Sequence, residues 1–332
     1  MKIAIVTRNK QDARRVFPEP LRERIRSMGE LYSTILCKKN LDEHRRAAQE
    51  CEILFATWGM EHFTREEIRR YFPKARALFY AAGSVQTFAG EFLDEGIRVF
   101  SAWRANAVPV AEYTAAQIRL ALKGYYTAQR LYRSGFYRAN LQAQRHTGNY
   151  QAVVGIVGAG AIGSMVCRRL AGPELHLLCC DPFLNGERAR ELNVERVPIE
   201  ELFERSDAVS NHLANKPELE GYYHYDLFRR MKPYAAFLNT GRGRQVINRD
   251  LARILRERRD LTAVLDVTDP EPLPILSPLR RRKNCFLTPH IAGSTGCEVE
   301  RMAEYMIDEL KRYLAGEAAV HEVLADMLST MA

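Results

Sequence analysis

Residues 153–163 read Val-Val-Gly-Ile-Val-Gly-Ala-Gly-Ala-Ile-Gly, and this stretch decides the fold of the chain. An apolar, β-rich run passes directly into a GxGxxG pattern formed by Gly158, Gly160 and Gly163, and then into a helical pattern. In that context Gly158 permits a tight turn, Gly160 lets the backbone approach a pyrophosphate, and Gly163 lets the helix pack on the strand. The phosphates are expected at the helix N-terminus, where free N–H groups favour anions. The stretch therefore predicts a dinucleotide-binding site.

Asp181 ends the next predicted strand, 23 positions after Gly158. A carboxylate at this place accepts hydrogen bonds from an adenosine ribose diol and repels a 2′-phosphate. The pattern therefore favours NAD over NADP. Acids often end strands, and Pro182 makes a turn by itself, so a structural role for Asp181 stays open at this point.

Strands and helices alternate on both sides of the glycine motif. Strands separated by helices imply parallel sheets. We therefore predict an α/β protein with two doubly wound parallel-sheet domains, the central one a Rossmann dinucleotide-binding domain. The predicted strands are residues 2–7, 31–37, 53–57, 77–82 and 97–101 in the first sheet and 152–157, 176–181, 208–212, 235–239, 262–266 and 285–288 in the second.

A long amphipathic pattern starts near Val108 and runs past Leu131, with Pro109 in its first turn, and we expect it to bridge the domains. Helical patterns return at residues 298–314 and 320–328, and we expect them to join the first domain. The predicted domains are a discontinuous substrate-binding domain, residues 1–103 and 294–332, and an NAD-binding Rossmann domain, residues 104–293. The apolar surface of the long helix further predicts a homodimer formed through the central domain.

The composition excludes several classes of protein. Hydrophobic residues make up 46% and charged residues 27% of the chain, which argues against disorder, collagen and coiled coil. No apolar run approaches the roughly 18–20 residues of a membrane span, and the first apolar run ends at Val6, so we expect no membrane partner and a cytoplasmic location. The seven Cys form no CxxC pair, which argues against a metal site. The net charge of +8 is spread among interleaved acids, so we expect no nucleic-acid partner.

Three further segments follow predicted strands, at the edge where open α/β sheets place ligands. They are residues 239–243, which include Arg242, residues 265–272, which include Glu271, and residues 288–293, which include His290. The planar guanidinium of an Arg binds a carboxylate and a developing alkoxide. A His supplies the proton, and a neighbouring Glu holds the imidazole and favours its charged form. Behind a dinucleotide motif, this set is what the reduction of a 2-keto acid requires.

At these residues the sequence resembles the D-isomer-specific 2-hydroxyacid dehydrogenases, and the resemblance covers most of the chain. Further matching stretches are residues 107–112, 205–207 before His212, 231–233 and 314–316. The resemblance implies a substrate domain made from both termini, a central NAD domain and catalysis in the cleft between them. It also implies hydride transfer between NAD(H) and a small 2-keto or 2-hydroxy acid, with Arg242, Glu271 and His290 as the catalytic set.

The resemblance and the motifs together give a set of candidate site residues. The expected cofactor-binding residues are Gly158, Gly160, Ala161, Ile162, Gly163, Asp181, His212, Thr240, Gly241 and Asp266, with Asp266 on the nicotinamide carboxamide. The substrate carboxylate is expected on Arg242 and on the backbone N–H groups of Ala82, Gly83 and Ser84.

Two segments depart from the family pattern. Residues 212–215 read His-Leu-Ala-Asn where family members usually follow the His with x-Pro, and residues 81–86 lack the acid of the family's glycine loop. The departures indicate a divergent branch, so the substrate of better-known members is not transferred to this chain. Formate oxidation is a further alternative, but family members with that activity typically carry Gln in place of Glu271. A non-catalytic NAD(H)-sensing interaction protein of the same fold is the main alternative.

Overall fold

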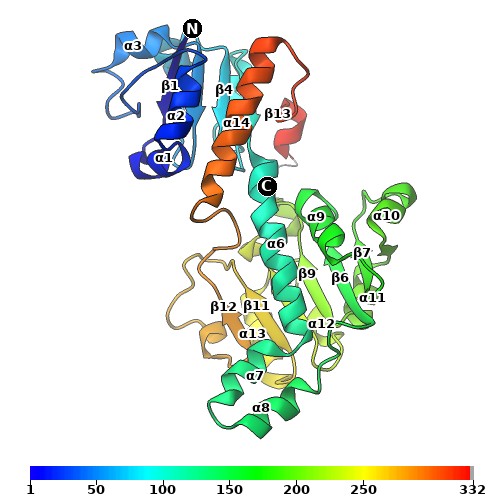
Figure 1. The fold of residues 1–332 in the computed structure, drawn as a ribbon. Helices are drawn as coiled ribbons and strands as arrows, with labels where there is room; N and C mark the ends of the chain where they lie inside the picture. The colour runs from blue at the N-terminus through cyan, green and yellow to red at the C-terminus, as the bar shows by residue number, and fades with distance from the viewer. Residues whose placement is uncertain (330–332) are drawn as a thin grey trace. The chain divides into compact units, whose positions relative to one another are not determined.

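The computed structural model describes residues 1–329, and the chain separates into two compact units. Unit 1 consists of residues 1–107 and the chain from Ser294 onward, and unit 2 consists of residues 108–293. Each unit is built on its own sheet (Figure 1). The sheets have six and seven strands, with helices on both faces, and the predicted class of two doubly wound α/β domains is confirmed.

The sheet of unit 1 has the order β13-β5-β4-β3-β1-β2. Its five N-terminal strands pair in parallel in a flavodoxin-like order, while β13 pairs antiparallel with β5. The strands are β1 (Lys2–Val6), β2 (Glu30–Leu31), β3 (Ile53–Ala56), β4 (Ala77–Tyr80), β5 (Arg98–Ser101) and β13 (Glu322–Val323).

Helices cover both faces of this sheet, and α14 packs against β4 and β5. The helices are α1 (Lys10–Val16), α2 (Glu19–Arg26), α3 (Arg45–Glu50), α4 (Arg65–Tyr71), α5 (Ala89–Asp94), α14 (Glu298–Ala315) and the 3₁₀ helix η4 (Ala325–Ser329). Three rings in register on adjacent strands form part of the core. Phe79 stacks on Phe55 at 5.5 Å and on Phe100 at 4.6 Å, and all three are fully buried. Their burial anchors the strands whose ends carry the loop at residues 81–84.

Two expectations for unit 1 are wrong. The predicted strand 31–37 shrinks to β2 and one isolated bridge between Val6 and Leu36, because Asn40 ties up the backbone: its side chain accepts from Cys37 N–H and donates to the Ile35 carbonyl. The expected helix 320–328 is replaced by β13 and η4, since the free edge of β5 offers strand pairing.

The sheet of unit 2 has the order β12-β11-β10-β9-β6-β7-β8, all parallel. The order reverses between β6 and β9, as in dinucleotide-binding sheets. The strands are β6 (Ala152–Val157), β7 (Leu175–Cys180), β8 (Glu195–Arg196), β9 (Ala208–Asn211), β10 (Ala236–Asn239), β11 (Thr262–Leu265) and β12 (Cys285–Leu287). The six predicted strands are present, and β8 is an additional one. β8 has two exposed polar residues and therefore lacks an apolar pattern.

Alternating residues of these strands enter two separate cores. On β10, for example, Phe237 packs with α11, α12 and α13, whereas Leu238 packs with α6, α9 and α10 on the opposite face. The helices are α6 (Trp103–Leu122), α7 (Tyr125–Tyr132), α8 (Phe136–Ala143), α9 (Ala161–Leu170), α10 (Gly186–Leu192), α11 (Ile199–Arg205), α12 (Tyr225–Arg229) and α13 (Asn248–Glu257), with 3₁₀ helices η1 (Pro217–Leu219), η2 (Gly243–Gln245) and η3 (Pro278–Arg281).

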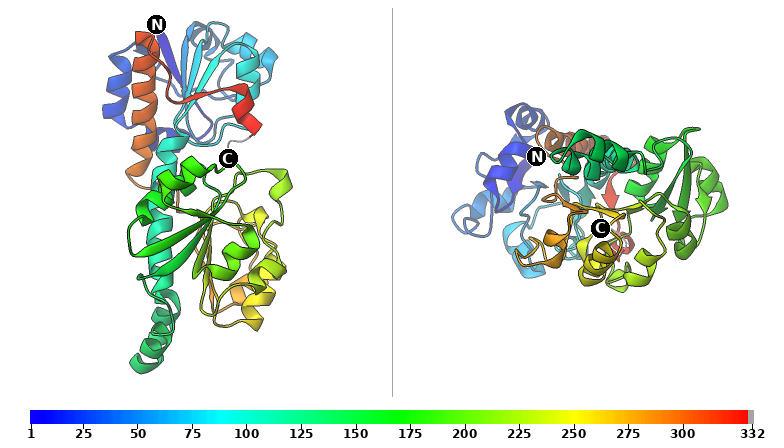
Figure 2. Two further views of the ribbon diagram at one scale, coloured as in Figure 1. Left: turned by 90° about the vertical axis from the view of Figure 1, so that its right-hand side faces the viewer. Right: turned by 90° about the horizontal axis from the view of Figure 1, so that it is seen from below.

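The expected helix from Val108 past Leu131 is corrected by the structure. Helix α6 begins earlier, at Trp103, so Pro109 lies inside it rather than in its first turn. The helix ends at Leu122 because Gly124 adopts a left-handed φ of 66°, and α7 and α8 follow as separate helices (Figure 2). In the described residues no helix is long and apolar enough to cross a membrane.

Candidate active site

The glycine motif lies where the strand order of unit 2 reverses. Gly158 has a φ of 93°, and a Cβ there would lie 2.7 Å from the carbonyl oxygen of His212, which follows β9. A Cβ on Gly163 would lie 1.9 Å from the carbonyl oxygen of Gly158, so this glycine lets α9 pack on the turn. Gly160 is different, because a Cβ there meets nothing within 4 Å. Gly160 thus leaves space at the N-terminus of α9, where Ala161 and Ile162 form the first turn, and the N-terminus of a helix favours anions.

Asp181 lies directly after β7 and faces this turn. One carboxylate oxygen accepts the Ala159 N–H at 2.6 Å, and the other accepts the Phe183 N–H at 2.7 Å. The side chain therefore orders the glycine loop as well as its own turn. Each oxygen has a second lone pair, so the carboxylate retains acceptor capacity for a ribose diol.

His212 is held by one hydrogen bond in an apolar setting. Its Nε2 lies 2.9 Å from the Ser210 hydroxyl, and its Nδ1 has no partner among the described residues. Burial lowers the pKa of His212 to about 3, because the charged imidazolium is poorly solvated there. The ring is therefore neutral at physiological pH and is not a source of positive charge for the cofactor.

The loop after β10 rests on a buried amide network that the sequence did not reveal. Asn211 donates to Asn239 at 2.9 Å and to Gln245 at 2.7 Å, and the Tyr223 hydroxyl donates to Asn211 at 2.8 Å. All four side chains are at most 1% exposed. The network is satisfied and links the segments after β9 and β10.

Thr240 and Gly241 are positioned by the same segment. The Thr240 hydroxyl lies 2.9 Å from the Thr114 hydroxyl on α6, and the Gly241 N–H donates to the Asn239 side chain at 3.0 Å. A Cβ on Gly241 would lie 3.0 Å from the Asn211 amide nitrogen, so the close approach favours glycine. The two residues thus hold the backbone that leads into Arg242.

Arg242 presents a partly buried guanidinium. Among the described residues, the only hydrogen bond of the guanidinium is the one that it donates to the Gly241 carbonyl at 2.9 Å. Burial lowers the pKa of Arg242 and the charge of Glu271 raises it, yet an Arg so far above neutrality stays protonated. Most of its donors are therefore available for an anion.

Asp266 lies at the end of β11 and is 2% exposed. Its carboxylate accepts the Thr288 hydroxyl at 2.6 Å and the N–H groups of Ile291 and Ala292 at 2.9 and 2.8 Å. The Thr288 hydroxyl in turn lies 3.1 Å from the Tyr113 hydroxyl. The family resemblance predicts Asp266 at the nicotinamide carboxamide. In the structure its carboxylate organises the turn that carries His290.

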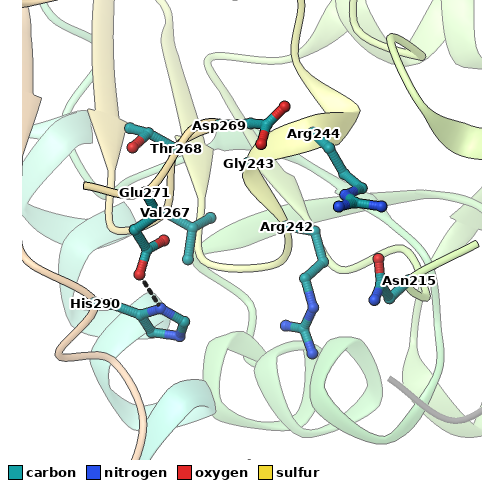
Figure 3. Close-up of a pocket in the computed structure, with 9 residues that line it drawn as sticks. All are labelled: Asn215, Arg242, Gly243, Arg244, Val267, Thr268, Asp269, Glu271 and His290. Carbon is teal, nitrogen blue, oxygen red and sulfur yellow. Dashed lines mark hydrogen bonds and ion pairs between the residues drawn. The ribbon is translucent and has the colours of Figure 1, made fainter. Parts of the chain in front are cut away.

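The structure brings Glu271 and His290 together. The Nδ1 atom of His290 lies 2.7 Å from the Oε1 atom of Glu271, with side chains 53% and 43% exposed (Figure 3). The His290 N–H donates to the Asp266 carbonyl at 3.0 Å, and the residue has a left-handed φ of 55°. The other ring nitrogen of His290, Nε2, makes no hydrogen bond among the described residues. It is therefore the nitrogen that is free to exchange a proton with a substrate.

These groups share one cavity of about 250 Å³ in unit 2. In Figure 3, Glu271 and His290 lie on one side of Arg242, and Asn215 and Arg244 lie on the other. Glu271, His290 and Arg242 are predicted from the sequence, whereas Asn215 and Arg244 are not. No local pattern identifies those two, because they come from different loops.

In unit 1, the loop after β4 has its carbonyl groups tied down. The Ser101 hydroxyl donates to the carbonyls of Ala82 and Gly83 at 3.0 and 2.6 Å. The Thr57 hydroxyl donates to the Ala81 carbonyl at 2.9 Å. Within residues 1–329, the N–H groups of Ala82, Gly83 and Ser84 make no hydrogen bond. The loop therefore offers free donors at the carboxyl end of the sheet.

Comparison with known proteins places this arrangement in a family. The model of the NAD binding domain of the D-isomer specific 2-hydroxyacid dehydrogenases matches residues 116–292. The chain belongs to this family. It is 34% identical over 251 residues to a glyoxylate reductase of Korarchaeum cryptofilum, which covers 74% of this chain and 75% of that protein. It is also 34% identical over 230 residues to an (S)-sulfolactate dehydrogenase of Chromohalobacter salexigens, covering 68% of this chain and 72% of that protein.

Solved structures share the fold over nearly the whole chain. The protein TT0316 of Thermus thermophilus aligns with a TM-score of 0.74 at 25% identity, over 98% of this chain and 100% of that one. D-mandelate dehydrogenase of Rhodotorula graminis aligns with a TM-score of 0.80 at 20% identity, over 97% of each chain. The membership confirms the predicted family, the oxidoreductase class, the Rossmann domain and NAD(H) as the cofactor.

Proposed function

We propose that the protein reduces a small 2-keto acid to the D-2-hydroxy acid with NADH, and catalyses the reverse reaction with NAD. One observation carries this proposal: His290 is held by Glu271 at 2.7 Å in the same cavity as the Arg242 guanidinium. A proton donor and a carboxylate anchor are the two groups that the reaction requires from the protein.

In the proposed mechanism, the Arg242 guanidinium binds the substrate carboxylate and polarises the 2-keto group. His290 Nε2 gives its proton to the carbonyl oxygen, so that the oxygen becomes the hydroxyl of the product. Glu271 keeps the ring oriented and balances the charge of the imidazolium. NADH, when bound, would supply the hydride that C2 accepts. In the oxidation direction, neutral His290 would take the hydroxyl proton back while Arg242 keeps the carboxylate in place.

The cofactor is proposed to bind along the carboxyl edge of β6, β7 and β9. Gly160 and the first turn of α9 would hold the pyrophosphate, and the Asp181 carboxylate would accept hydrogen bonds from the ribose diol. Gly158, Gly163, Thr240 and Gly241 shape the backbone beside it, while His212 contributes a neutral ring. Because Asp181 is an anion, we expect NADH to be preferred over NADPH.

In unit 1, we propose that the free N–H groups of Ala82, Gly83 and Ser84 bind a carboxylate. Successive N–H groups in a loop form an anion-binding concavity. The Ser101 hydroxyl fixes this geometry by holding the opposing carbonyls.

The direct test is NADH oxidation with a panel of 2-keto acids, monitored at 340 nm. Turnover with at least one of them, and formation of the D-hydroxy acid, supports the proposal. Tight NADH binding without turnover of any member of the panel would favour the NAD(H)-sensing alternative.

We also propose a homodimer formed through unit 2. Several large apolar side chains of α7 and α8 are exposed: Tyr132, Phe136, Tyr137 and Leu141 are 62%, 57%, 86% and 58% exposed. Exposed apolar patches of this kind are typical of interfaces. Light scattering should give the mass of two chains at micromolar concentration, and the paired substitution Phe136→Ser and Tyr137→Ser should shift it towards one.

A further inference from the structure

The cavity that holds Arg242 contains a second guanidinium, that of Arg244. The reaction proposed above uses one Arg, one His and one Glu, and leaves Arg244 without a role. We propose that Arg244 and Asn215 form a second anion site, which binds a carboxylate, sulfonate or phosphate on the side chain of the substrate. The inference rests on the proposed function and names its substrate class: 2-keto acids that carry two anionic groups.

The backbone places Arg242 and Arg244 on either side of a fixed glycine. A Cβ on Gly243 would lie 2.0 Å from the carbonyl carbon of Thr268, so the chain here packs directly on the loop after β11. The Arg244 carbonyl accepts the Gly221 N–H at 3.0 Å, and the neighbouring Gln245 carbonyl accepts the Tyr223 N–H at 2.9 Å. Both guanidinium groups therefore extend from one rigid segment into one cavity.

The buried amide network places Asn215 in the same cavity. Gln245 donates to the Ala214 carbonyl at 2.7 Å and accepts from Asn211 at 2.7 Å, which fixes the backbone next to Asn215. The Asn215 side chain makes no hydrogen bond within the described residues, and it lines the same cavity as Arg244, on the same side of Arg242 in Figure 3. Its carboxamide N–H and the guanidinium N–H groups are matched donors for the oxygens of one anion.

The present partner of Arg244 is readily exchanged. The Arg244 guanidinium lies 2.9 Å from the Glu220 carboxylate, and the side chains are 52% and 53% exposed. Such exposed ion pairs contribute little, because water already solvates both charges. A substrate anion bound at the cavity can therefore replace Glu220, whereas a neutral side chain gains nothing from Arg244.

The order of the groups in Figure 3 fits a dianionic keto acid. His290 lies on one side of Arg242 and Arg244 lies on the other. A keto acid whose 2-keto oxygen faces His290 and whose carboxylate contacts Arg242 lies in the cavity that Arg244 also lines. Arg244 is then available to a second anionic group at the end of a flexible side chain. The geometry thus favours substrates whose side chain ends in an anion.

The test compares substrates that differ mainly in the second charge. Oxaloacetate and sulfopyruvate are the dianionic probes, and 2-ketobutyrate is the monoanionic one, each measured with saturating NADH. The protein should show a kcat/KM at least tenfold higher for the better dianion than for 2-ketobutyrate. Arg244→Gln should remove most of this preference, because it should raise the KM for the dianion. Glu220→Gln should lower the same KM, because it removes the carboxylate that competes for Arg244.

Arg249→Gln is the matched control, because it removes the same charge from the same unit at a side chain that is 91% exposed. It should retain the parental preference. The inference would be overturned if Arg244→Gln lowered kcat/KM equally for mono- and dianionic substrates, or if the parent protein had similar kcat/KM values for both. The proposed function would still stand in either case. A larger Kd for NADH in Arg244→Gln would also overturn the inference, because it would show that Arg244 binds the cofactor. Failure of every keto acid would instead reject the proposed function.

Discussion

The imidazole of His290 and the carboxylate of Glu271 meet at 2.7 Å, through Nδ1 and Oε1. The contact needs an unusual backbone, because His290 has a φ of 55°, a conformation that costs a non-glycine residue about 1 kcal/mol or more. The turn is held by the Asp266 carbonyl and carboxylate, which accept N–H groups from His290, Ile291 and Ala292. The strained backbone thus directs Nδ1 of His290 at Glu271 and leaves Nε2 without a hydrogen bond among the described residues.

Substitution of Glu271 should separate its hydrogen bond from its charge. Glu271→Gln keeps an acceptor for His290 but loses the negative charge, whereas Glu271→Ala loses both. We expect kcat/KM for reduction to fall in both variants, and about tenfold further in Ala than in Gln, because the Ala variant also loses the hydrogen bond that orients the proton donor His290. Equal activity of the Ala variant and the parent would show that Glu271 does not position His290.

Two glycines of the motif should respond differently to the same added methyl group. Gly163→Ala places a carbon 1.9 Å from a backbone oxygen, so the free energy of unfolding should fall by about 2–3 kcal/mol. Gly160→Ala meets no protein atom within 4 Å, so urea unfolding should be nearly unchanged. NADH binding by Gly160→Ala should nevertheless weaken at least tenfold, because the methyl group occupies the space proposed for the pyrophosphate. Unchanged NADH affinity in Gly160→Ala would place the phosphates elsewhere.

Cofactor choice should depend on Asp181. The parent is expected to favour NADH in kcat/KM, and Asp181→Ser should narrow the ratio of NADH to NADPH by removing the like-charge repulsion. Asp181→Asn, which removes the charge but keeps one oxygen that can accept the Ala159 N–H, should narrow the ratio as well. If the ratio of kcat/KM with NADH to that with NADPH is unchanged in both variants, another residue discriminates between the two cofactors.

The half-buried ring of His212 should make the protein less stable in acid. Its pKa is lowered from 6.5 to about 3 in the folded state, so the unfolded chain binds more protons between these values. Stability from this group is complete above pH 6.5 and is lost as pH falls towards 3. Between pH 6.5 and 5 the free energy of unfolding should drop by about 1–2 kcal/mol more in the parent than in His212→Asn. Parallel pH profiles in urea titrations would contradict this assignment.

The sequence patterns that proved informative are local ones. The glycine motif, the buried strands of unit 2 and the residues directly after them could be predicted, because an apolar run, a glycine at a turn and a polar strand end are short-range signals. Arg242, Glu271 and His290 are examples, and the structure brings all three into one cavity.

Other features depend on contacts between distant segments. The segment at residues 31–37 has the composition of a strand, yet the Asn40 side chain takes its backbone groups. Asn211 and Gln245 are unremarkable in the sequence and form a buried network only after β9 and β10 pair. Asn215 and Arg244 likewise line one cavity only after folding, which explains why the proposed second anion site could not be predicted.

The most direct test of the account is single-turnover oxidation of bound NADH by the best 2-keto acid, compared between the parent and His290→Ala. We expect His290→Ala to bind NADH with nearly the parental Kd and to oxidise it about 10²–10⁴-fold more slowly, because the carbonyl oxygen lacks its proton donor. A His290→Ala protein that oxidises NADH at close to the parental rate would contradict the assignment of His290 as the proton donor.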